Sequence, residues 1–588
     1  MAEHEKQAVN TAPADVEVGS AEDVEAVMKK YDRESNVRIW TGFPARLVRY
    51  GMALFMLTMI WVSMFSTAEG SVRRCFFLGI VLAFVFIMYP IKKNMKLKPN
   101  HIPIYDVVLL VVAVGVYFYQ IIFKEELIAM GRRIGTPQII IGIIAILVLV
   151  EACRRVVGIP IIIVAAAFVA YTLLPMGADK PLQGTIYNLV YTTNGIIGTP
   201  IQVCSTYIFL FVLFGSFLEA TGIAAFFIDC ANSIAGAATG GPAKVAVISS
   251  ALCGMVSGSS VGNTVTTGAV TIPLMKRTGY PPEFAGAVEA AASTGGQIMP
   301  PIMGAAAFLM AEMTDTEYAD ILVRAILPAA LYFTGIFLMV HFKAKSIGLK
   351  GLDKDSLPKG KDIFPKLYLL LPLIVLVFMV IQSGTFTMAY SAVVACLVAI
   401  VAGMADRETG SKKFVMMVPA IPLLVYALGK VYLPDVIPAF ADSLEMQETF
   451  TLVCFGIFFV LVVACHLISK PNMQNVGTYI NALESGTKST LSVGVACGMA
   501  GIIAGVVTMT GLANVLITAI VQVANGQLII ALFLTMLCCI VLGMGVPTTA
   551  NYVIMATTCA PILVQGMGMD LMAANFFVFY FGIVADIT

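Results

Sequence analysis

The sequence predicts an all-α polytopic membrane protein, and three observations lead to this fold class. Hydrophobic residues make up 59% of the 588 positions and charged residues only 12%, whereas about a quarter of an ordinary soluble domain is charged. Apolar runs of helical length recur along nearly the whole chain, and two stretches rich in Gly, Ser, Thr, Asn and Pro interrupt them. Since each crossing of the bilayer needs about 20 apolar residues, we expect about 15–17 membrane helices.

Residues 1–46 are expected to form a polar tail in the cytoplasm. Met1–Glu25 is acidic and has no apolar centre, so it is not a secretory signal. Basic residues then gather around the start of the first apolar run, at Lys29, Lys30, Arg33, Arg38, Arg46 and Arg49. Because cytoplasmic flanks of membrane helices have an excess of Lys and Arg, the N-terminus is predicted to lie inside the cell. Arg73 and Arg74 in the next loop count against this orientation.

Residues 47–176 form a first membrane block. It contains five apolar runs, Leu47–Phe65, Phe76–Tyr89, Ile104–Phe123, Gln138–Val150 and Val156–Leu174. The polar stretch Gly177–Gln183 separates this block from residues 184–588.

Residues 184–588 form a second, longer block. A lysine-rich loop, His341–Lys366, divides it and is expected in the cytoplasm. Its other apolar runs are Val203–Phe217, Ile223–Ile234, Ala246–Val256, Tyr318–Val340, Leu367–Ile381, Met388–Val401, Phe414–Leu433, Phe450–His466, Leu491–Met509, Leu528–Leu542 and Tyr552–Val564.

The two polar interruptions are the candidate functional sites. The first occupies residues 257–301 and the second residues 543–588. In hydrocarbon every main-chain polar group needs a partner, so a helix broken by Gly and Pro survives only inside protein or beside a water-filled cavity. Its free carbonyl oxygens can coordinate a cation such as sodium, and the N-terminus of the next helix favours a carboxylate. Small residues that only allow close helix packing are the alternative interpretation.

Hydroxyl and amide side chains in these two sites are candidates to complete a binding shell. They are Ser259, Ser260, Asn263, Thr264, Thr548, Thr549 and Asn551. The segment Gly258–Thr264 resembles Gly543–Thr549, and Gly279–Met299 resembles Gly568–Thr588. In this alignment Gln297 corresponds to Asp586. Because the counterparts of Pro300 and Pro301 would fall after Thr588, we expect the chain to be cut short inside its second site.

Ionisable residues within apolar stretches are functional candidates. Glu289 lies among small residues of the first site, where a structural hydrogen bond and a functional role both remain open. Glu219, Asp229 and Lys244 lie near the ends of apolar runs and are expected to reach the membrane interface. Glu151, Arg154 and Arg155 are expected to form an interfacial cluster of the same kind.

Several classes of function are not supported. The net charge of +1 does not indicate a basic surface for binding nucleic acid. The four histidines are scattered, and no two have the spacing of metal ligands. The twelve cysteines mostly lie in apolar runs, as small buried hydrophobic residues do. We find no catalytic constellation, no metal motif and no phosphate-binding loop, so we predict that the protein is not an enzyme and has no organic cofactor. Coupling to an ion gradient is the expected source of energy.

Four segments resemble the permease of tripartite ATP-independent periplasmic (TRAP) transporters. They are GSSVGNTVTTGAVTIPLMKRTGY, PPEFAGAVEAAASTGGQIMPP, MGAAAFLMAE and GMGVPTTANYVIMATTCAP, within Gly258–Glu312 and Gly543–Thr588. The resemblance is to the branch whose periplasmic binding protein is of the TAXI type, with the small membrane subunit fused to the large one. Residues 47–176 would then be the scaffold block that matches the small subunit.

The resemblance implies an elevator-type transporter in the bacterial inner membrane, with two inverted repeats that contain re-entrant helical hairpins. It implies sodium-coupled uptake of a small organic anion, a carboxylate, that a periplasmic TAXI-type protein delivers. The hairpin tips would be Ser259–Thr264 and Val546–Asn551, facing Gly295–Pro301 and Gly582–Thr588. Sodium would bind near Gly258, Gly262, Gly295, Gln297, Pro300, Gly543, Val546 and Asp586.

Two other interpretations remain open. A sodium- or proton-coupled anion symporter that needs no binding protein also uses Ser, Asn and Thr at hairpin tips, although the joined first block disfavours it. An ion channel could use a filter rich in Gly and Thr. Channels usually repeat the filter around a symmetric pore, whereas this chain has two dissimilar halves.

Overall fold

The computed structural model describes the chain as an assembly of helices. The described residues are 36–66, 68–92, 99–174, 178, 180–353, 355, 357–382, 384–406, 412–437, 440, 443–468 and 476–587, and no strand is assigned within them. These residues divide into two compact units. Unit 1 holds Leu210–Met303 and Glu317–Gly486, and unit 2 holds the residues up to Phe209, Gly304–Thr316 and those from Thr487 on.

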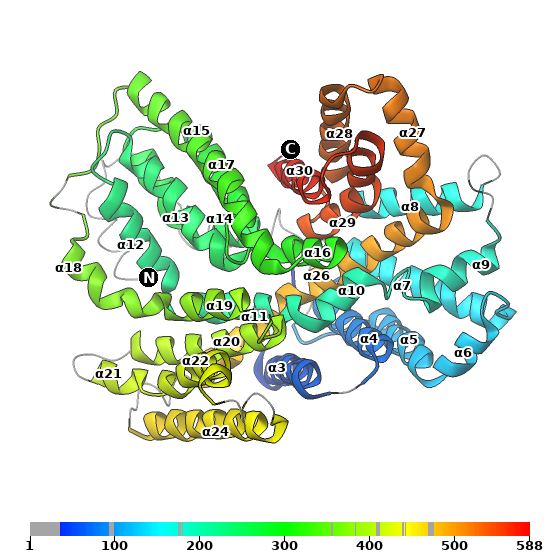
Figure 1. Cartoon of the computed structure of the whole chain (residues 1–588), viewed down its shortest axis with the longest axis horizontal. Coiled ribbons are helices and arrows are strands. Elements are labelled where there is room, and N and C mark those ends of the chain that lie inside the picture. Colours follow the sequence, from blue (N-terminus) through cyan, green and yellow to red (C-terminus); the bar gives the residue numbers. More distant parts are fainter. Residues whose placement is uncertain are drawn as a thin grey trace. The chain divides into compact units, whose positions relative to one another are not determined.

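Figure 1 labels the helices of both units. Those of unit 2 are α3 (Gly42–Phe65), α4 (Gly70–Met88), α5 (Ile104–Ile122), α6 (Lys124–Met130), α7 (Thr136–Val156), α8 (Pro160–Leu173), α9 (Leu182–Ile186), η1 (Tyr187–Tyr191), α10 (Thr199–Val203), η2 (Cys204–Ile208), α16 (Gly304–Thr314), α27 (Leu512–Ala524), α28 (Leu528–Gly543), α29 (Thr548–Thr558), η6 (Ile562–Gly566), α30 (Leu571–Val584) and η7 (Ala585–Ile587).

Unit 1 contains α11 (Phe209–Ala220), α12 (Ile223–Ala235), α13 (Gly241–Ser257), α14 (Ser260–Arg277), α15 (Pro282–Gly295), η3 (Gly296–Ile298), α17 (Tyr318–Ser346), α18 (Gly360–Ile363), η5 (Phe364–Leu370), α19 (Leu371–Ile381), α20 (Met388–Asp406), α21 (Lys412–Met417), α22 (Ala420–Val436) and α24 (Leu444–Ile468). Helix α26 (Val476–Thr510) contributes residues to both units.

Nine helices of the described part are long and apolar enough to cross a membrane. Six further apolar helices, including α13 and α28, are shorter, at 10–17 residues. The chain is therefore a multi-pass membrane protein, as its composition predicts. The expected total of about 15–17 membrane helices and the division into blocks at residues 176 and 184 stay predictions.

Proline sets one helix boundary that the sequence analysis missed. The run Phe414–Leu433 was expected to be one span, but it divides into α21 and α22. Pro419 lies between them at the start of α22. Because proline has no main-chain N–H and its ring clashes with the preceding turn, the helix is interrupted there. Helices α27 and α30 lie where no apolar run was identified.

Apolar side chains hold unit 1 together in two groups of helices, drawn one above the other in Figure 1. One core joins α19, α20, α22 and α24 around residues such as Met379, Val398 and Phe458. The other joins α13, α14, α15 and α17 through Ala246, Ala292 and other small or apolar residues. This second group carries the first polar interruption, so the candidate site is built on closely packed helices.

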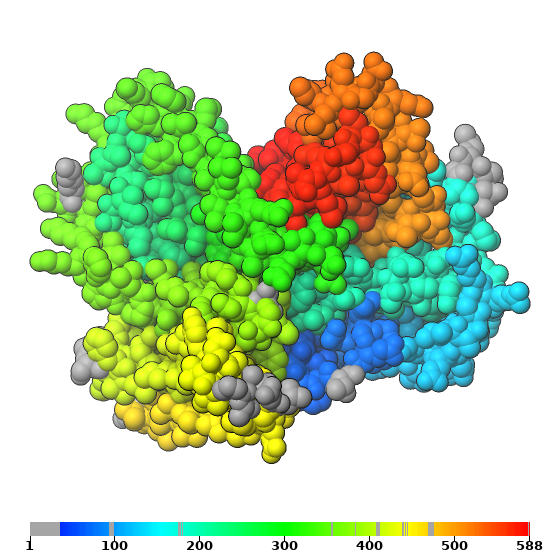
Figure 2. Space-filling model, in the orientation of Figure 1, coloured from blue at the N-terminus to red at the C-terminus, as the bar shows by residue number. Residues whose placement is uncertain are grey.

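In unit 2, α30 packs against α28 and α29, and α4 packs against α5. Figure 2 shows the C-terminal residues, in red, beside the orange residues of α27 and α28. The second polar interruption thus lies inside a group of helices from the last hundred residues.

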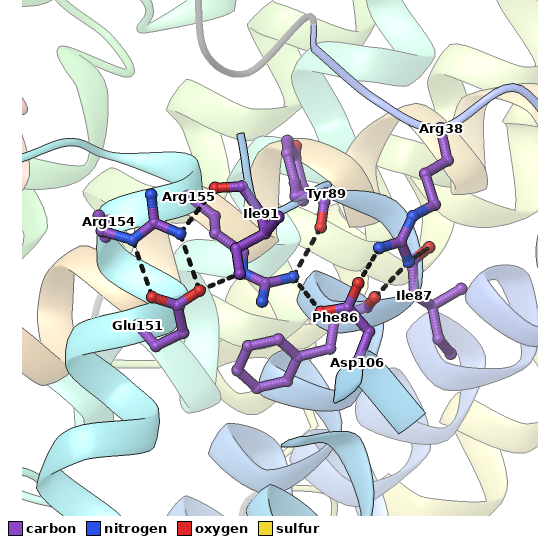
Figure 3. A network of polar contacts seen from close by, with 9 residues as sticks. All are labelled: Arg38, Phe86, Ile87, Tyr89, Ile91, Asp106, Glu151, Arg154 and Arg155. Carbon is purple, nitrogen blue, oxygen red and sulfur yellow. Dashed lines mark hydrogen bonds and ion pairs between the residues drawn. The ribbon is translucent and has the colours of Figure 1, made fainter. Parts of the chain in front are cut away.

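A network of charged side chains joins the first helices of unit 2 (Figure 3). Asp106, in the first turn of α5, forms ion pairs with both Arg38 and Arg155. The Nη1 atom of Arg155 lies 2.6 Å from Oδ1 of Asp106, and both side chains are fully buried. Charges persist in an apolar interior only when they are paired, so Asp106 is the counter-ion that allows two guanidinium groups to be buried.

The same arginines bind the C-terminal end of α4. Arg38 donates to the main-chain oxygens of Phe86, at 2.7 Å, and Ile87, at 3.0 Å. Arg155 donates to the main-chain oxygen of Tyr89 at 3.0 Å. The last carbonyls of a helix lack partners within it and form its negative end. The network therefore caps α4 and ties it to α5 and α7.

Two expectations about interfacial charges are wrong in part. Glu151 accepts hydrogen bonds from Arg154 and Arg155, as a cluster would, but Arg155 turns inward to Asp106. Lys244 is buried rather than extended to an interface, and its ammonium group lies 5.0 Å from the centre of the Phe337 ring. In both cases the packed helices supply a partner that the linear sequence does not reveal.

Candidate functional site

The first polar interruption forms a break between two helices of unit 1. Helix α13 ends at Ser257, and Gly258 follows with φ of 57°, a left-handed conformation that glycine adopts readily. The Oγ of Ser259 accepts a hydrogen bond from the Gly262 N–H at 3.1 Å and caps α14. The break therefore presents the C-terminus of one helix beside the N-terminus of the next.

Asn263 is fully buried in the first turns of α14. Its Nδ2 donates to the main-chain oxygen of Ser250 at 2.8 Å, whereas its Oδ1 is buried without a partner among the described residues. Two glycines meet beside this amide: a Cβ on Gly254 would lie 2.2 Å from the Cα of Gly296. The close main-chain contact encloses the amide and leaves one oxygen available.

The segment after α15 lies opposite the tip of α14. Gln297 donates from Nε2 to the Oγ of Ser260 at 3.2 Å. Gly295 lies against Tyr332, where a Cβ would be 2.4 Å from a ring carbon. The structure thus brings together the two segments that the sequence analysis set against each other in the first site.

Glu289, in α15, has a cage of hydroxyl groups around its fully buried carboxyl. Ser250 donates to Oε1 at 2.8 Å and Ser293 at 3.2 Å. Thr267 also donates to Oε1, and Thr271 donates to Oε2. The geometry shows a buried, hydrogen-bonded carboxyl group, and a functional role for it stays a prediction.

The second polar interruption forms a comparable break in unit 2. Helix α28 ends at Gly543 and α29 begins at Thr548. The Val546 N–H donates to the Gly543 oxygen at 3.1 Å and closes the turn between them.

Asn551 is fully buried in α29. Its Nδ2 donates to the main-chain oxygen of Gly582 at 2.7 Å, and its Oδ1 is buried without a partner within the described part of the chain. A Cβ on Gly543 would lie 2.5 Å from Nδ2 of Asn551 and 2.7 Å from the Cβ of Ala585.

The contacts of the two asparagines correspond, each within its own unit. Gly254 lies against both Gly296 and the amide of Asn263, as Gly543 lies against both Ala585 and the amide of Asn551. This correspondence pairs Gly254 with Gly543. The sequence comparison had paired Gly543 with Gly258, which lies one helical turn after Gly254. Residue similarity misled that comparison, because Gly258 begins the polar string.

The other predicted residues have smaller roles in this geometry. Thr264 donates its hydroxyl proton to the Ser260 oxygen of its own helix. Gly262 supplies the capped N–H, Pro300 is half-buried after η3, Val546 and Thr549 are buried, and Thr548 is half-buried at the start of α29. The side chain of Asp586 lies outside the described part.

Sequence reasoning missed Ser250 and Gly254. Both lie in the apolar run of α13, where a small residue is normally a packing residue. The available signal was spacing: Ser250, Gly254 and Gly258 follow one another at intervals of four and so share a helix face.

The donor atoms at both sites fit a small, hard cation. The unpartnered Oδ1 atoms of Asn263 and Asn551 are neutral oxygens, and broken helices coordinate sodium through such oxygens. Across the described residues, no three His, Cys, Asp or Glu side chains gather where they could hold a metal ion. A cation here would therefore be held by amide, hydroxyl and main-chain oxygens.

Comparison with known proteins identifies similar sequences. The sequence model described as "Tripartite ATP-independent periplasmic transporter, DctM component" matches residues 144–588. The chain is 24% identical to a putative TRAP transporter large permease protein of Haemophilus influenzae, over 40% of this chain and 55% of the relative. It is 27% identical to the C4-dicarboxylate TRAP transporter large permease protein DctM of Rhodobacter capsulatus, over 30% and 43%.

A third relative is the sialic acid TRAP transporter large permease protein SiaM of Vibrio cholerae. It is 27% identical over 34% of this chain and 46% of the relative. The chain thus spans about half the length of the curated relatives that it matches.

Proposed function

Because this chain belongs to the family of the DctM component of tripartite ATP-independent periplasmic transporters, we propose that it is the permease of a sodium-coupled uptake system for a small organic anion. The family match covers most of the chain, and the helices α3–α5, α17 and α26 are long and apolar enough to span a bilayer. The site of action is then the bacterial inner membrane, with the N-terminus in the cytoplasm.

The observation that supports sodium coupling most directly is the pair of unpartnered asparagine oxygens. A buried polar oxygen without a hydrogen bond costs about 1–3 kcal/mol, so Asn263 Oδ1 and Asn551 Oδ1 favour a ligand that needs an acceptor. A bound cation supplies that partner and adds a positive charge to each site. The hydroxyl and main-chain oxygens at the same helix breaks complete its shell.

The substrate class follows from the helix N-termini and from the relatives. Helices α14 and α29 each begin at a candidate site, and free N–H groups in a first turn attract a carboxylate. Relatives are named for C4-dicarboxylate, sialic acid and 2,3-diketo-L-gulonate, all of which are carboxylates. Ser259, Ser260, Thr264, Thr548 and Thr549 are the hydroxyl groups proposed to contact the substrate.

The partner and the mechanism extend the family assignment. A periplasmic protein of the TAXI type would deliver the substrate, and the two helix breaks would be the tips of inverted-repeat hairpins that move together in an elevator. Residues 1–143 precede the matched part. They contain α3, α4 and α5, which is consistent with a fused small subunit.

The first experiment is a thermal midpoint of the purified chain in sodium, potassium and choline. A ligand that binds only the folded state at a hundredfold excess over its dissociation constant stabilises it by about 2.7 kcal/mol. A rise with sodium alone is expected. Equal midpoints in the three salts would remove the support for sodium coupling.

A second experiment separates the alternatives. Proteoliposomes are expected to take up the carboxylate only with both a sodium gradient and the binding protein. Uptake without the binding protein would favour a simple symporter, and an ionic current without substrate would favour a channel.

A further inference from the structure

A buried carboxyl group without a counter-ion lies next to the first candidate cation site. The Glu289 side chain is fully buried, and no Lys, Arg or His among the described residues forms an ion pair with it. A buried carboxylate without a cation is costly, and such a group usually takes a proton instead. In the described part of the chain, its hydrogen-bond partners are the four hydroxyl groups of Ser250, Thr267, Thr271 and Ser293.

The hydroxyl cage can satisfy the carboxyl with or without a proton. Each hydroxyl has one proton to donate and can also accept. With Glu289 ionised, all four hydroxyls donate to it. With Glu289 protonated, its O–H donates to Thr267 or Thr271, whose own proton turns to a main-chain oxygen. Those oxygens are in place: Asn263 O lies 2.8 Å from Oγ1 of Thr267, and Thr267 O lies 3.1 Å from Oγ1 of Thr271.

The same hydrogen bonds connect the carboxyl to Asn263. Ser250 donates to Glu289 and its main-chain oxygen accepts from Nδ2 of Asn263. Thr267 likewise contacts both Glu289 and the main-chain oxygen of Asn263. A cation at Asn263 Oδ1 would therefore lie close to the carboxyl, where its charge favours the ionised form.

Other ionisable groups lie on the three helices packed against α15. The helices packed against it contribute Lys244 and Cys253 of α13, Lys276 and Arg277 of α14, and Tyr318, Asp320, Arg324, Tyr332, His341, Lys343 and Lys345 of α17. Of these, Cys253 lies within electrostatic range of Glu289, as it does of Glu219 on α11. Tyr332 donates its hydroxyl proton to the oxygen of Ala291.

From this geometry we infer that Glu289 binds and releases one proton during transport, and that a cation at Asn263 and this proton exclude each other. The step forms one O–H bond at the carboxyl with a proton from water and breaks the same bond on release. The inference rests on the proposed function for the cation and extends it, since protons would take part in the coupling.

Infrared difference spectroscopy of the purified chain tests proton binding directly. Acidification should produce the C=O stretching band of a buried carboxylic acid, which Glu289→Gln should abolish. Glu283→Gln is the matched control, because Glu283 lies on the same helix and is exposed, and it should keep the band. A spectrum of Glu289→Gln identical to that of the wild type would overturn the inference. If that variant does not fold, Ser293→Ala should shift the band, and an unchanged band would overturn the inference equally.

The coupling is tested by repeating the titration in sodium and in choline. Sodium at about ten times its dissociation constant should compete with the proton and lower the apparent proton affinity about tenfold, which is one pH unit. Asn263→Ala should remove this effect while keeping the band. A band that titrates at the same pH in both salts would overturn the mutual exclusion. A thermal midpoint that does not respond to sodium would instead contradict the proposed cation site, so the two failures are distinguishable.

Discussion

The Nδ2 atom of Asn263 lies 2.8 Å from the main-chain oxygen of Ser250. This hydrogen bond fixes the amide so that its oxygen, which is buried and unpartnered among the described residues, remains for a ligand. Asn551 is fixed in the same way by the oxygen of Gly582. The Asn263 amide joins the two sides of its helix break, whereas the Asn551 amide ties α29 to α30. The proposed ligand binding and the local packing therefore depend on the same side chains.

Asn263→Ala is expected to reduce the sodium-induced rise in thermal midpoint to the part that the second site contributes. It removes the proposed ligand oxygen together with one buried hydrogen bond, and that bond contributes about 1 kcal/mol to stability. Asn514→Ala is the control, since Asn514 is exposed near the start of α27, and it should respond to sodium as the wild type does. A full sodium response in Asn263→Ala would show that the cation binds elsewhere.

Gly254→Ala is expected to lower stability by about 1–3 kcal/mol, the usual cost of overpacking. Its methyl group would lie 2.2 Å from the Cα of Gly296, so the two main chains must separate. Gly286→Ala on α15 is the matched control, because its methyl group meets nothing within 4 Å. It should be neutral or stabilise by up to about 1 kcal/mol. Thermal unfolding of both variants in the same detergent is the measurement, and equal midpoints would contradict the close contact.

Gly543→Ala should have the same effect in the second site. The added Cβ would lie 2.5 Å from the Nδ2 of Asn551 and push the amide away from Gly582. Loss of the part of the sodium response that comes from the second site is expected along with lower stability. Gly115→Ala on α5 provides the comparison, since that position is open and belongs to the same unit. Wild-type sodium binding by Gly543→Ala would argue that the second site takes no cation.

Asp106→Asn is expected to destabilise the chain by about 3–5 kcal/mol, the cost of removing one partner of a buried ion pair. Arg38, whose side chain is nearly fully buried, would then lose Asp106 as counter-ion, and the fully buried Arg155 would keep only Glu151. Glu151→Gln removes a partly exposed carboxylate and leaves Arg155 paired with Asp106, so it should cost less than Asp106→Asn. The test compares the two variants in denaturant. A similar loss in both would mean that burial does not set the strength of this network.

The class of fold and the position of both helix breaks could be predicted from the sequence. Ser259, Asn263 and Asn551 were identified because polar residues with Gly and Pro are unusual in apolar helices, and the structure places each beside a helix break. Ser250 and Gly254 were not identified, because each resembles an ordinary packing residue of α13. Only the approach of α14 and α15 gives them a role.

The network around Asp106 illustrates the same limit. Arg155 was expected at an interface with Glu151, which is four residues away in the chain. Its other partner, Asp106, is almost fifty residues away, and Arg38 is farther still. No local spacing rule connects these three positions.

The sequence by itself determined that this is a helical membrane protein with two interrupted helices, since hydropathy and helix-breaking residues are local properties. The tertiary structure decided which oxygen of each site remains without a partner, which glycines allow main chains to touch, and which charges are buried together. These depend on contacts between helices far apart in the chain. At such contacts, moving a residue by one helical turn, as from Gly254 to Gly258, changes all of its neighbours on the other helices.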